Sequence, residues 1–65
     1  MFRIVHYPDL VQPGAGRPGY DEVDGQPIYY ASRKQAEAAL LEQYPGKTLS
    51  EIFTYAQKRV EGCYA

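Results

Sequence analysis

The chain has 65 residues and a formal net charge of −1, so it has room for one small domain and no bulk positive charge for nucleic acid or anionic lipid. Its single cysteine, Cys63, excludes an intrachain disulfide, and Cys63 with the single histidine, His6, is too few ligands for a zinc site. A lone cysteine is typical of a reducing compartment. We therefore expect a cytoplasmic protein that holds no metal or other cofactor.

Residues 1–6 lack the apolar core of a signal peptide, and no apolar run approaches the roughly 20 residues that cross a bilayer. We therefore expect no membrane partner. A domain of this size is marginally stable, and disulfides and metals are excluded as sources of extra stability. Association with another protein, or with a second copy as a homodimer, is the remaining common source.

The N-terminal half predicts short strands. Residues 2–7 alternate and are rich in strand formers, and residues 26–31 form a second such run. The Gly- and Pro-rich stretch at about 8–19 predicts a flexible loop. A loop reaching from the first run to the second would be unusually long for a compact domain. The alternative is a further strand at 20–23, which Asp24-Gly25, a favoured hairpin turn, returns into the strand at 26–31.

The C-terminal half predicts two helices, at about 33–44 and 49–60, because apolar residues recur there at helical spacing. Pro45-Gly46 separates the two helices. In this interpretation Lys58 and Arg59 lie in the last turn of the second helix, where the helix dipole favours cations. Each helix is preceded by a capping-box pair, namely Ser32 with Gln35 and Thr48 with Glu51.

This order of elements predicts one α+β domain over residues 1–65, with a small antiparallel sheet of two or three strands packed against the two helices. Such a sheet leaves an edge whose free backbone groups suit a partner strand. The expected core comprises Ile4, Leu40, Ile52, Phe53 and Val60.

The chain offers no recognisable catalytic site. Gly14 to Gly19 matches the dinucleotide-binding pattern G-x-G-x-x-G, but the first strand does not lead directly into it and no helix follows it. His6 has no nucleophile at a recognised catalytic spacing. We therefore expect a protein that is not an enzyme.

A short acidic segment is the strongest candidate for a binding site. Asp21, Glu22 and Asp24 fall within four residues, and neighbouring acids repel one another without adding to a core. Tyr20 precedes them, and Tyr29 belongs to a strand in which alternation exposes either Tyr29 or its neighbour. Tyrosine is enriched at binding hot spots. These five residues are the predicted partner-binding site, and a solvated acidic turn with ordinary surface tyrosines is the competing interpretation.

Residues 28–60 resemble a ribbon-helix-helix DNA-binding subunit, with a strand, a helix, a glycine turn and a second helix that begins within residues 46–52. The resemblance implies a dimeric DNA-binding regulator. The strand lacks the polar or basic side chains with which that family reads the major groove, and the chain lacks a basic footprint. Nucleic acid is therefore the less favoured partner. Phosphate contacts in this alternative would come from Arg33, Lys34, Lys47, Lys58 and Arg59.

In format the whole chain resembles small phage-encoded inhibitors of host machinery, such as anti-CRISPR proteins, which are short, poor in cysteine and non-catalytic. The resemblance implies a host–virus interaction in which acidic and aromatic side chains cover a partner's nucleic-acid-binding site. The leading prediction is therefore a non-enzymatic inhibitor or adaptor that binds a basic surface of a larger protein or complex. The ribbon-helix-helix regulator is the alternative.

Overall fold

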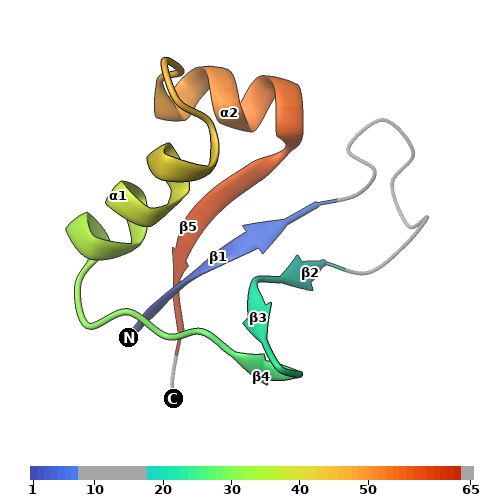
Figure 1. Cartoon of the computed structure of the whole chain (residues 1–65), viewed down its shortest axis with the longest axis vertical. Helices are drawn as coiled ribbons and strands as arrows, with labels where there is room; N and C mark the ends of the chain where they lie inside the picture. Colours follow the sequence, from blue (N-terminus) through green and yellow to red (C-terminus); the bar gives the residue numbers. More distant parts are fainter. Residues whose placement is uncertain (8–17, 64–65) are drawn as a thin grey trace.

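The computed structural model describes residues 1–7 and 18–63, which form a three-stranded antiparallel sheet, a separate two-stranded hairpin and two helices (Figure 1). The predicted class, an α+β domain with a small antiparallel sheet and two helices, is confirmed. The elements in chain order are β1 (Phe2–His6), β2 (Gly19–Tyr20), β3 (Glu22–Val23), β4 (Gln26–Pro27), α1 (Arg33–Gln43), α2 (Leu49–Ala56) and β5 (Lys58–Gly62).

The sheet has the order β2-β1-β5, and β1 pairs antiparallel with both of its neighbours. In the longer of the two pairings Ile4 lies opposite Val60. Hydrogen bonds of 2.9 Å from Tyr7 N to Gln57 O and from Cys63 N to Met1 O extend this pairing at both ends. The first and last described strands therefore lie side by side, with β1 central and β5 at one edge of the sheet.

The core lies between the sheet and the two helices. α1 contacts both β5 and β1, and α2 contacts β5. Alternation along the strands places Ile4 and Val60 on the same face of the sheet, so they form one apolar surface under the helices. Buried side chains from the two helices complete this core, namely Ala36, Leu40 and Ile52.

The prediction that Phe53 is a deeply buried core residue is wrong. Its side chain is half-buried, and the Arg59 guanidinium lies 5.4 Å from its ring centroid. The other four expected core residues are buried. Consecutive residues of a helix are rotated by about 100° around its axis, so Ile52 and Phe53 cannot both face the sheet. Ile52 takes the inward position.

Both predicted helix starts are confirmed by their caps. The Ser32 side chain accepts a hydrogen bond of 3.1 Å from Gln35 N at the start of α1. At the start of α2, Thr48 Oγ1 accepts from Glu51 N at 3.2 Å, and Glu51 Oε1 accepts from Thr48 N at 3.0 Å. These bonds satisfy backbone N–H groups that have no partner within a helix.

The predicted end of the second helix is wrong. α2 ends at Ala56 instead of residue 60, and the chain continues as β5. Gln57 closes the helix in the left-handed region, with φ of 59°, and its N–H bonds to Phe53 O at 3.0 Å. Lys58 and Arg59 therefore lie in a strand. The physical reason is that β1 needs a partner on this side, and pairing with β5 satisfies its backbone groups.

The predicted hairpin forms in a shorter version. β3 pairs with β4 around Asp24 and Gly25, whose φ angles of 52° and 77° are those of a type I′ turn. The strand expected at 26–31 ends at Pro27, and Tyr30 makes only an isolated bridge to Phe2. The strand expected at 20–23 is divided between β2 and β3, because Asp21 interrupts it.

The flexible loop predicted at about 8–19 falls mainly on residues 8–17, which lie outside the described residues. Of its last two residues, Gly19 belongs to β2 and pairs with His6. The G-x-G-x-x-G motif falls mostly on the same undescribed stretch.

Candidate partner-binding surface

The β3–β4 hairpin extends from the sheet on the side away from the two helices (Figure 1). All four of its strand residues are exposed, and Val23 is exposed to 59%. No residue of the hairpin belongs to the buried core cluster. The hairpin is therefore a surface element that the core does not require.

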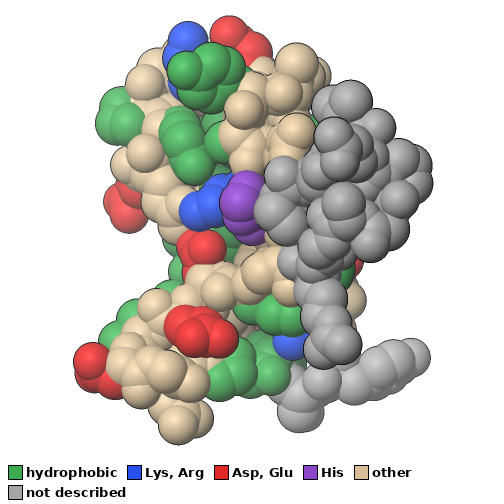
Figure 2. All heavy atoms as spheres, turned by 90° about the vertical axis from the view of Figure 1, so that its right-hand side faces the viewer, with side chains coloured by type: hydrophobic (Ala, Val, Ile, Leu, Met, Phe, Trp, Pro, Cys, Tyr) green, Lys and Arg blue, Asp and Glu red, His purple; other side chains and the backbone are tan. Residues whose placement is uncertain are grey.

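Two of the predicted site residues, Glu22 and Asp24, lie on this hairpin and are exposed. Within the described part of the chain neither carboxylate forms an ion pair or a hydrogen bond. Figure 2 shows acidic side chains on the surface at the level of the molecule where Figure 1 places β3 and β4. The hairpin thus carries an uncompensated negative charge at the surface.

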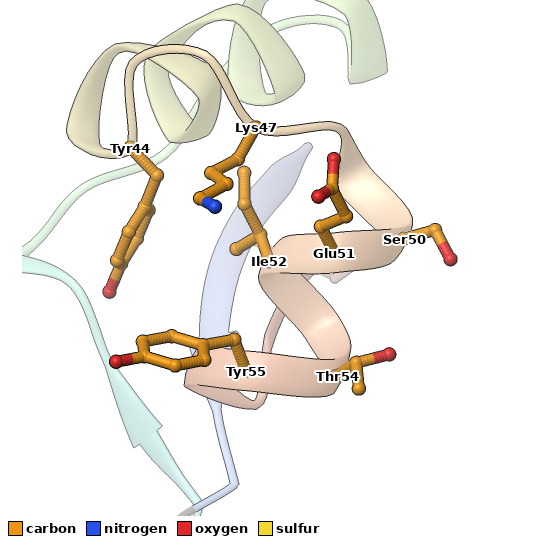
Figure 3. Close-up of a pocket in the computed structure, with 7 residues that line it drawn as sticks. All are labelled: Tyr44, Lys47, Ser50, Glu51, Ile52, Thr54 and Tyr55. Carbon is orange, nitrogen blue, oxygen red and sulfur yellow. The ribbon is translucent and has the colours of Figure 1, made fainter.

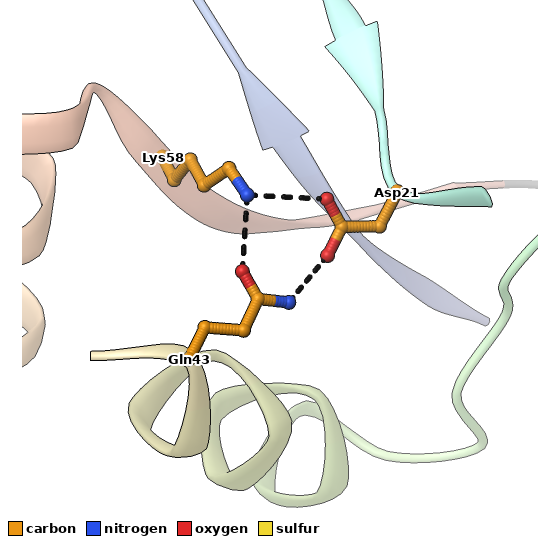
Figure 4. Close-up of polar contacts among 3 residues, drawn as sticks. All are labelled: Asp21, Gln43 and Lys58. Carbon is orange, nitrogen blue, oxygen red and sulfur yellow. Dashed lines mark hydrogen bonds and ion pairs between the residues drawn. The ribbon is translucent and has the colours of Figure 1, made fainter. Parts of the chain in front are cut away.

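Asp21, the first of the three acids, has different surroundings. Its Oδ1 lies 3.4 Å from Lys58 Nζ, and its Oδ2 accepts a hydrogen bond of 2.6 Å from Gln43 Nε2 (Figure 4). Lys58 Nζ also donates to Gln43 Oε1 at 3.0 Å, which closes a triangle of contacts. The expectation that folding cannot explain the acidic segment is therefore wrong for Asp21, which joins the start of the hairpin to α1 and β5.

The backbone of Asp21 strengthens this attachment. Its N–H donates to Ile4 O at 3.2 Å, and its carbonyl accepts from Ile28 N at 3.1 Å. The chain therefore pairs with β1 before Asp21 and with β4 after it. This change of partner is what turns the hairpin away from the sheet.

The two predicted tyrosines are both accessible. Tyr20 on β2 is exposed to 40%, and the Arg3 guanidinium lies 3.7 Å from its ring centroid, a cation–π contact. Tyr29, two residues beyond β4, is exposed to 37%, whereas Tyr30 packs against the core. Tyr20 therefore borders the hairpin through Asp21 and is held in place by Arg3.

Sequence reasoning missed a polar cluster on the sheet face opposite the helices. Tyr7 donates a hydrogen bond from its hydroxyl to Glu61 Oε2, and Arg59 Nε donates to the same oxygen at 2.8 Å. These donors favour the carboxylate and hold the pKa of Glu61 below its ordinary value, with the Tyr7 bond as the larger cause. The same bond raises the pKa of Tyr7, because losing the phenol proton would place two negative charges together.

Sequence reasoning also missed a groove beside α2, with a volume of about 340 Å³. Tyr44 packs against the core, but its ring also forms one wall of this groove, with Tyr55 on another (Figure 3). Tyr55 is exposed to 88%. The groove is further lined by Lys47, Ser50, Glu51, Ile52 and Thr54.

Within residues 1–7 and 18–63, no three His, Cys, Asp or Glu side chains lie close enough together to hold a metal ion. No helix in that part of the chain has the length and apolar character needed to cross a membrane.

Comparison of the chain with protein-family models, curated proteins and solved structures finds no match.

Proposed function

We propose that the protein is a non-enzymatic binding module, an inhibitor or adaptor that presents the β3–β4 hairpin to a basic surface on a larger protein. The observation that carries this proposal is that the hairpin exposes Glu22, Val23 and Asp24 while adding nothing to the core. Neither carboxylate has a cationic partner among the described residues, so the two charges repel one another, and a basic partner would relieve that repulsion.

The surface divides into parts with different roles. Glu22 and Asp24 provide the charge that steers a basic partner, and Val23 provides apolar contact between them. Tyr20 and Tyr29 provide larger and stiffer contact areas at the border. Asp21 contributes indirectly, because its contacts with Lys58 and Gln43 fix the direction of the hairpin.

The class of partner that fits this surface is a protein whose basic patch binds nucleic acid, as the partners of anti-CRISPR-like inhibitors do. An acidic hairpin with flanking aromatic rings would compete for the sites that phosphates and bases occupy. Occlusion of this kind requires no catalytic group.

The test begins with affinity capture from the source organism and identification of the retained protein by mass spectrometry. Association of the purified partner is then measured over a range of salt concentrations. The variant Glu22→Gln/Asp24→Asn should associate about tenfold more slowly, with a flatter salt dependence. Glu37→Gln/Glu42→Gln removes the same charge from α1 and should associate like the wild type. An unchanged rate and salt slope for the hairpin variant would refute the proposal.

The aromatic anchor is tested separately. Tyr20→Ala should mainly accelerate dissociation and weaken binding by about 2 kcal/mol, since buried tyrosines act chiefly on the dissociation rate. Tyr55→Ala removes an equally large exposed ring from α2 and should leave the affinity unchanged.

The ribbon-helix-helix alternative draws no support from the strand that precedes α1. β4 pairs with β3 of its own chain and ends at Pro27, before residue 28, where the resemblance begins. A salt titration against duplex DNA tests the alternative directly. Affinity that falls steeply with salt would favour the DNA-binding regulator over the proposed module.

A further inference from the structure

The outer edge of β5 is unpaired among the strands of the described residues, because β1 occupies only one side of β5. The bonds from Tyr7 N to Gln57 O and from Cys63 N to Met1 O fix which residues of the ladder are hydrogen-bonded pairs. In an antiparallel ladder these pairs alternate with residues whose backbone groups point the other way. The residues whose N–H and C=O groups point away from β1 are Lys58, Val60 and Gly62.

A side-chain contact agrees with this direction. Arg33 Nη1, at the start of α1, donates to Val60 O at 3.3 Å, which requires that carbonyl to point outward. A pocket of about 210 Å³ opens beside the same edge, between α1 and β5. Among the described residues, one exposed guanidinium bonds to this edge, through a long and weak hydrogen bond.

The side chains along this edge are self-complementary. Arg59 and Glu61 flank Val60 and carry opposite charges on the face of the sheet opposite the helices. Their side chains are exposed to 53% and 31%, so both reach solvent. A strand with this pattern matches an antiparallel copy of itself.

We propose that a second copy of the chain pairs antiparallel with this edge, about a two-fold axis at Val60. Val60 would form a hydrogen-bonded pair with Val60 of the second copy, and Lys58 would pair with Gly62 of the second copy. Arg59 then lies opposite Glu61 of the second copy, and the same pair recurs across the axis. The result is one sheet that continues through both copies.

Charge selects this register over its neighbours. A shift of the pairing by two residues keeps the outward-pointing backbone groups of the two strands opposite one another. It moves the two-fold axis from Val60 to Arg59 or to Glu61. Either shift places two like charges directly opposite each other, which destabilises a strand pair. The intrachain bonds to Glu61 both end on Oε2, so Oε1 is the atom that meets Arg59 of the second copy.

The position of the edge keeps this inference independent of the proposed function. β5 forms one edge of the sheet, whereas the hairpin continues from β2 at the other. Pairing at β5 would therefore leave both hairpins exposed. Loss of self-association would not affect the binding of one hairpin, and loss of hairpin binding would not affect self-association.

Sedimentation equilibrium of the full chain tests the proposal from about 1 µM to about 1 mM, because a short edge interface predicts micromolar affinity or weaker. The average mass should rise with concentration from that of one chain, 7.4 kDa, toward twice that value. The mass of one chain at every concentration would overturn the proposal.

Two charge reversals identify the edge. Arg59→Glu makes both flanking positions acidic, and Glu61→Arg makes both basic, so each variant alone should self-associate about tenfold more weakly. An equimolar mixture of the two should associate again, because every cross-strand pair is then of opposite charge. Lys34→Glu and Glu42→Arg apply the same charge changes on α1 and should behave like the wild type. Unchanged association of the single variants, or no association in the mixture, would overturn the edge assignment.

Amide hydrogen exchange on the wild-type chain provides a test that needs no variant. The N–H groups of Arg59 and Glu61 bond to β1 and should be protected at all concentrations. The N–H groups of Lys58, Val60 and Gly62 should gain protection only as the concentration rises. Protection of these three that does not depend on concentration would contradict pairing with a second copy.

Discussion

Asp21 and Lys58 form an ion pair of 3.4 Å between the start of the hairpin and the first residue of β5, with both side chains largely buried. Gln43 bonds to both partners. The contact joins three segments that are far apart in the sequence. It assigns to one acid of the cluster a structural role that its two neighbours do not share.

Asp21→Ala should therefore destabilise the protein by about 1–2 kcal/mol, because Lys58 loses its partner in a partly buried setting and exposed Gln43 loses a hydrogen bond. Urea unfolding followed by circular dichroism measures this change. Glu22→Ala is the matched control, since this neighbouring acid makes no such contact, and its effect should stay within about 0.5 kcal/mol. Equal effects of the two substitutions would show that the triangle does not form in solution.

Ile52→Ala should destabilise the protein more than Phe53→Ala does, although Phe53 has the larger side chain. Ile52 is 1% exposed, so its truncation should leave a cavity and cost about 2–5 kcal/mol. Phe53 is half-buried beside Arg59, and the loss of its ring should cost less than the truncation of Ile52. Thermal melts of both variants measure the order, and a larger loss for Phe53→Ala would contradict the position of α2.

Thr48→Ala should cost about 1 kcal/mol, because it removes the side-chain acceptor of the capping box at the start of α2. The capping bond also holds the pKa of Glu51 below its ordinary value, chiefly through the Thr48 backbone N–H. Titration of the Glu51 carboxyl by NMR in Thr48→Gly, which keeps that N–H, should therefore still show a lowered pKa. An ordinary pKa there would indicate that the N-terminal turn of α2 had frayed.

Stability should fall in acid partly through Glu61. Its pKa is lower in the folded protein than in the unfolded chain, so the unfolded chain binds more protons over the interval between the two values. Its contribution is present above the ordinary glutamate pKa of about 4.3 and is lost as the pH falls through the folded value. Glu61→Gln should therefore be less stable than the wild type at pH 7, and the gap should narrow in acid. Glu42→Gln is the control, and a gap that is constant with pH would contradict the bond from Tyr7.

The elements that sequence predicted well are those whose signals are local. The caps at Ser32 and Thr48 and the turn at Asp24-Gly25 depend on residues within four positions of one another. β5 was missed because Val60 also continues the helical spacing of Ile52 and Ala56. Only the pairing of Val60 with Ile4, at the other end of the chain, distinguishes a strand from a further helical turn.

The residues of the candidate site divide in the same way, into those with local sequence signals and those whose partners are distant in the sequence. The exposure of Glu22 and Asp24 follows from their place beside a tight turn, and sequence predicted it. The role of Asp21 did not follow, because its partners come from α1 and from a strand that was assigned to a helix. The cluster of Tyr7, Arg59 and Glu61 was missed for the same reason, since Arg59 and Glu61 share a face only in a strand.

The pairing of β1 with β5 also determines when the fold can form during synthesis. Phe2 pairs with Gly62, so the central strand of the sheet lacks this neighbour until almost all of the described chain has left the ribosome. Contacts this distant in sequence slow folding relative to chains of the same size built from local contacts. The nascent chain therefore carries Ile4 and Val5 exposed until β5 has emerged, and the hairpin, whose pairing is local, is free to form first.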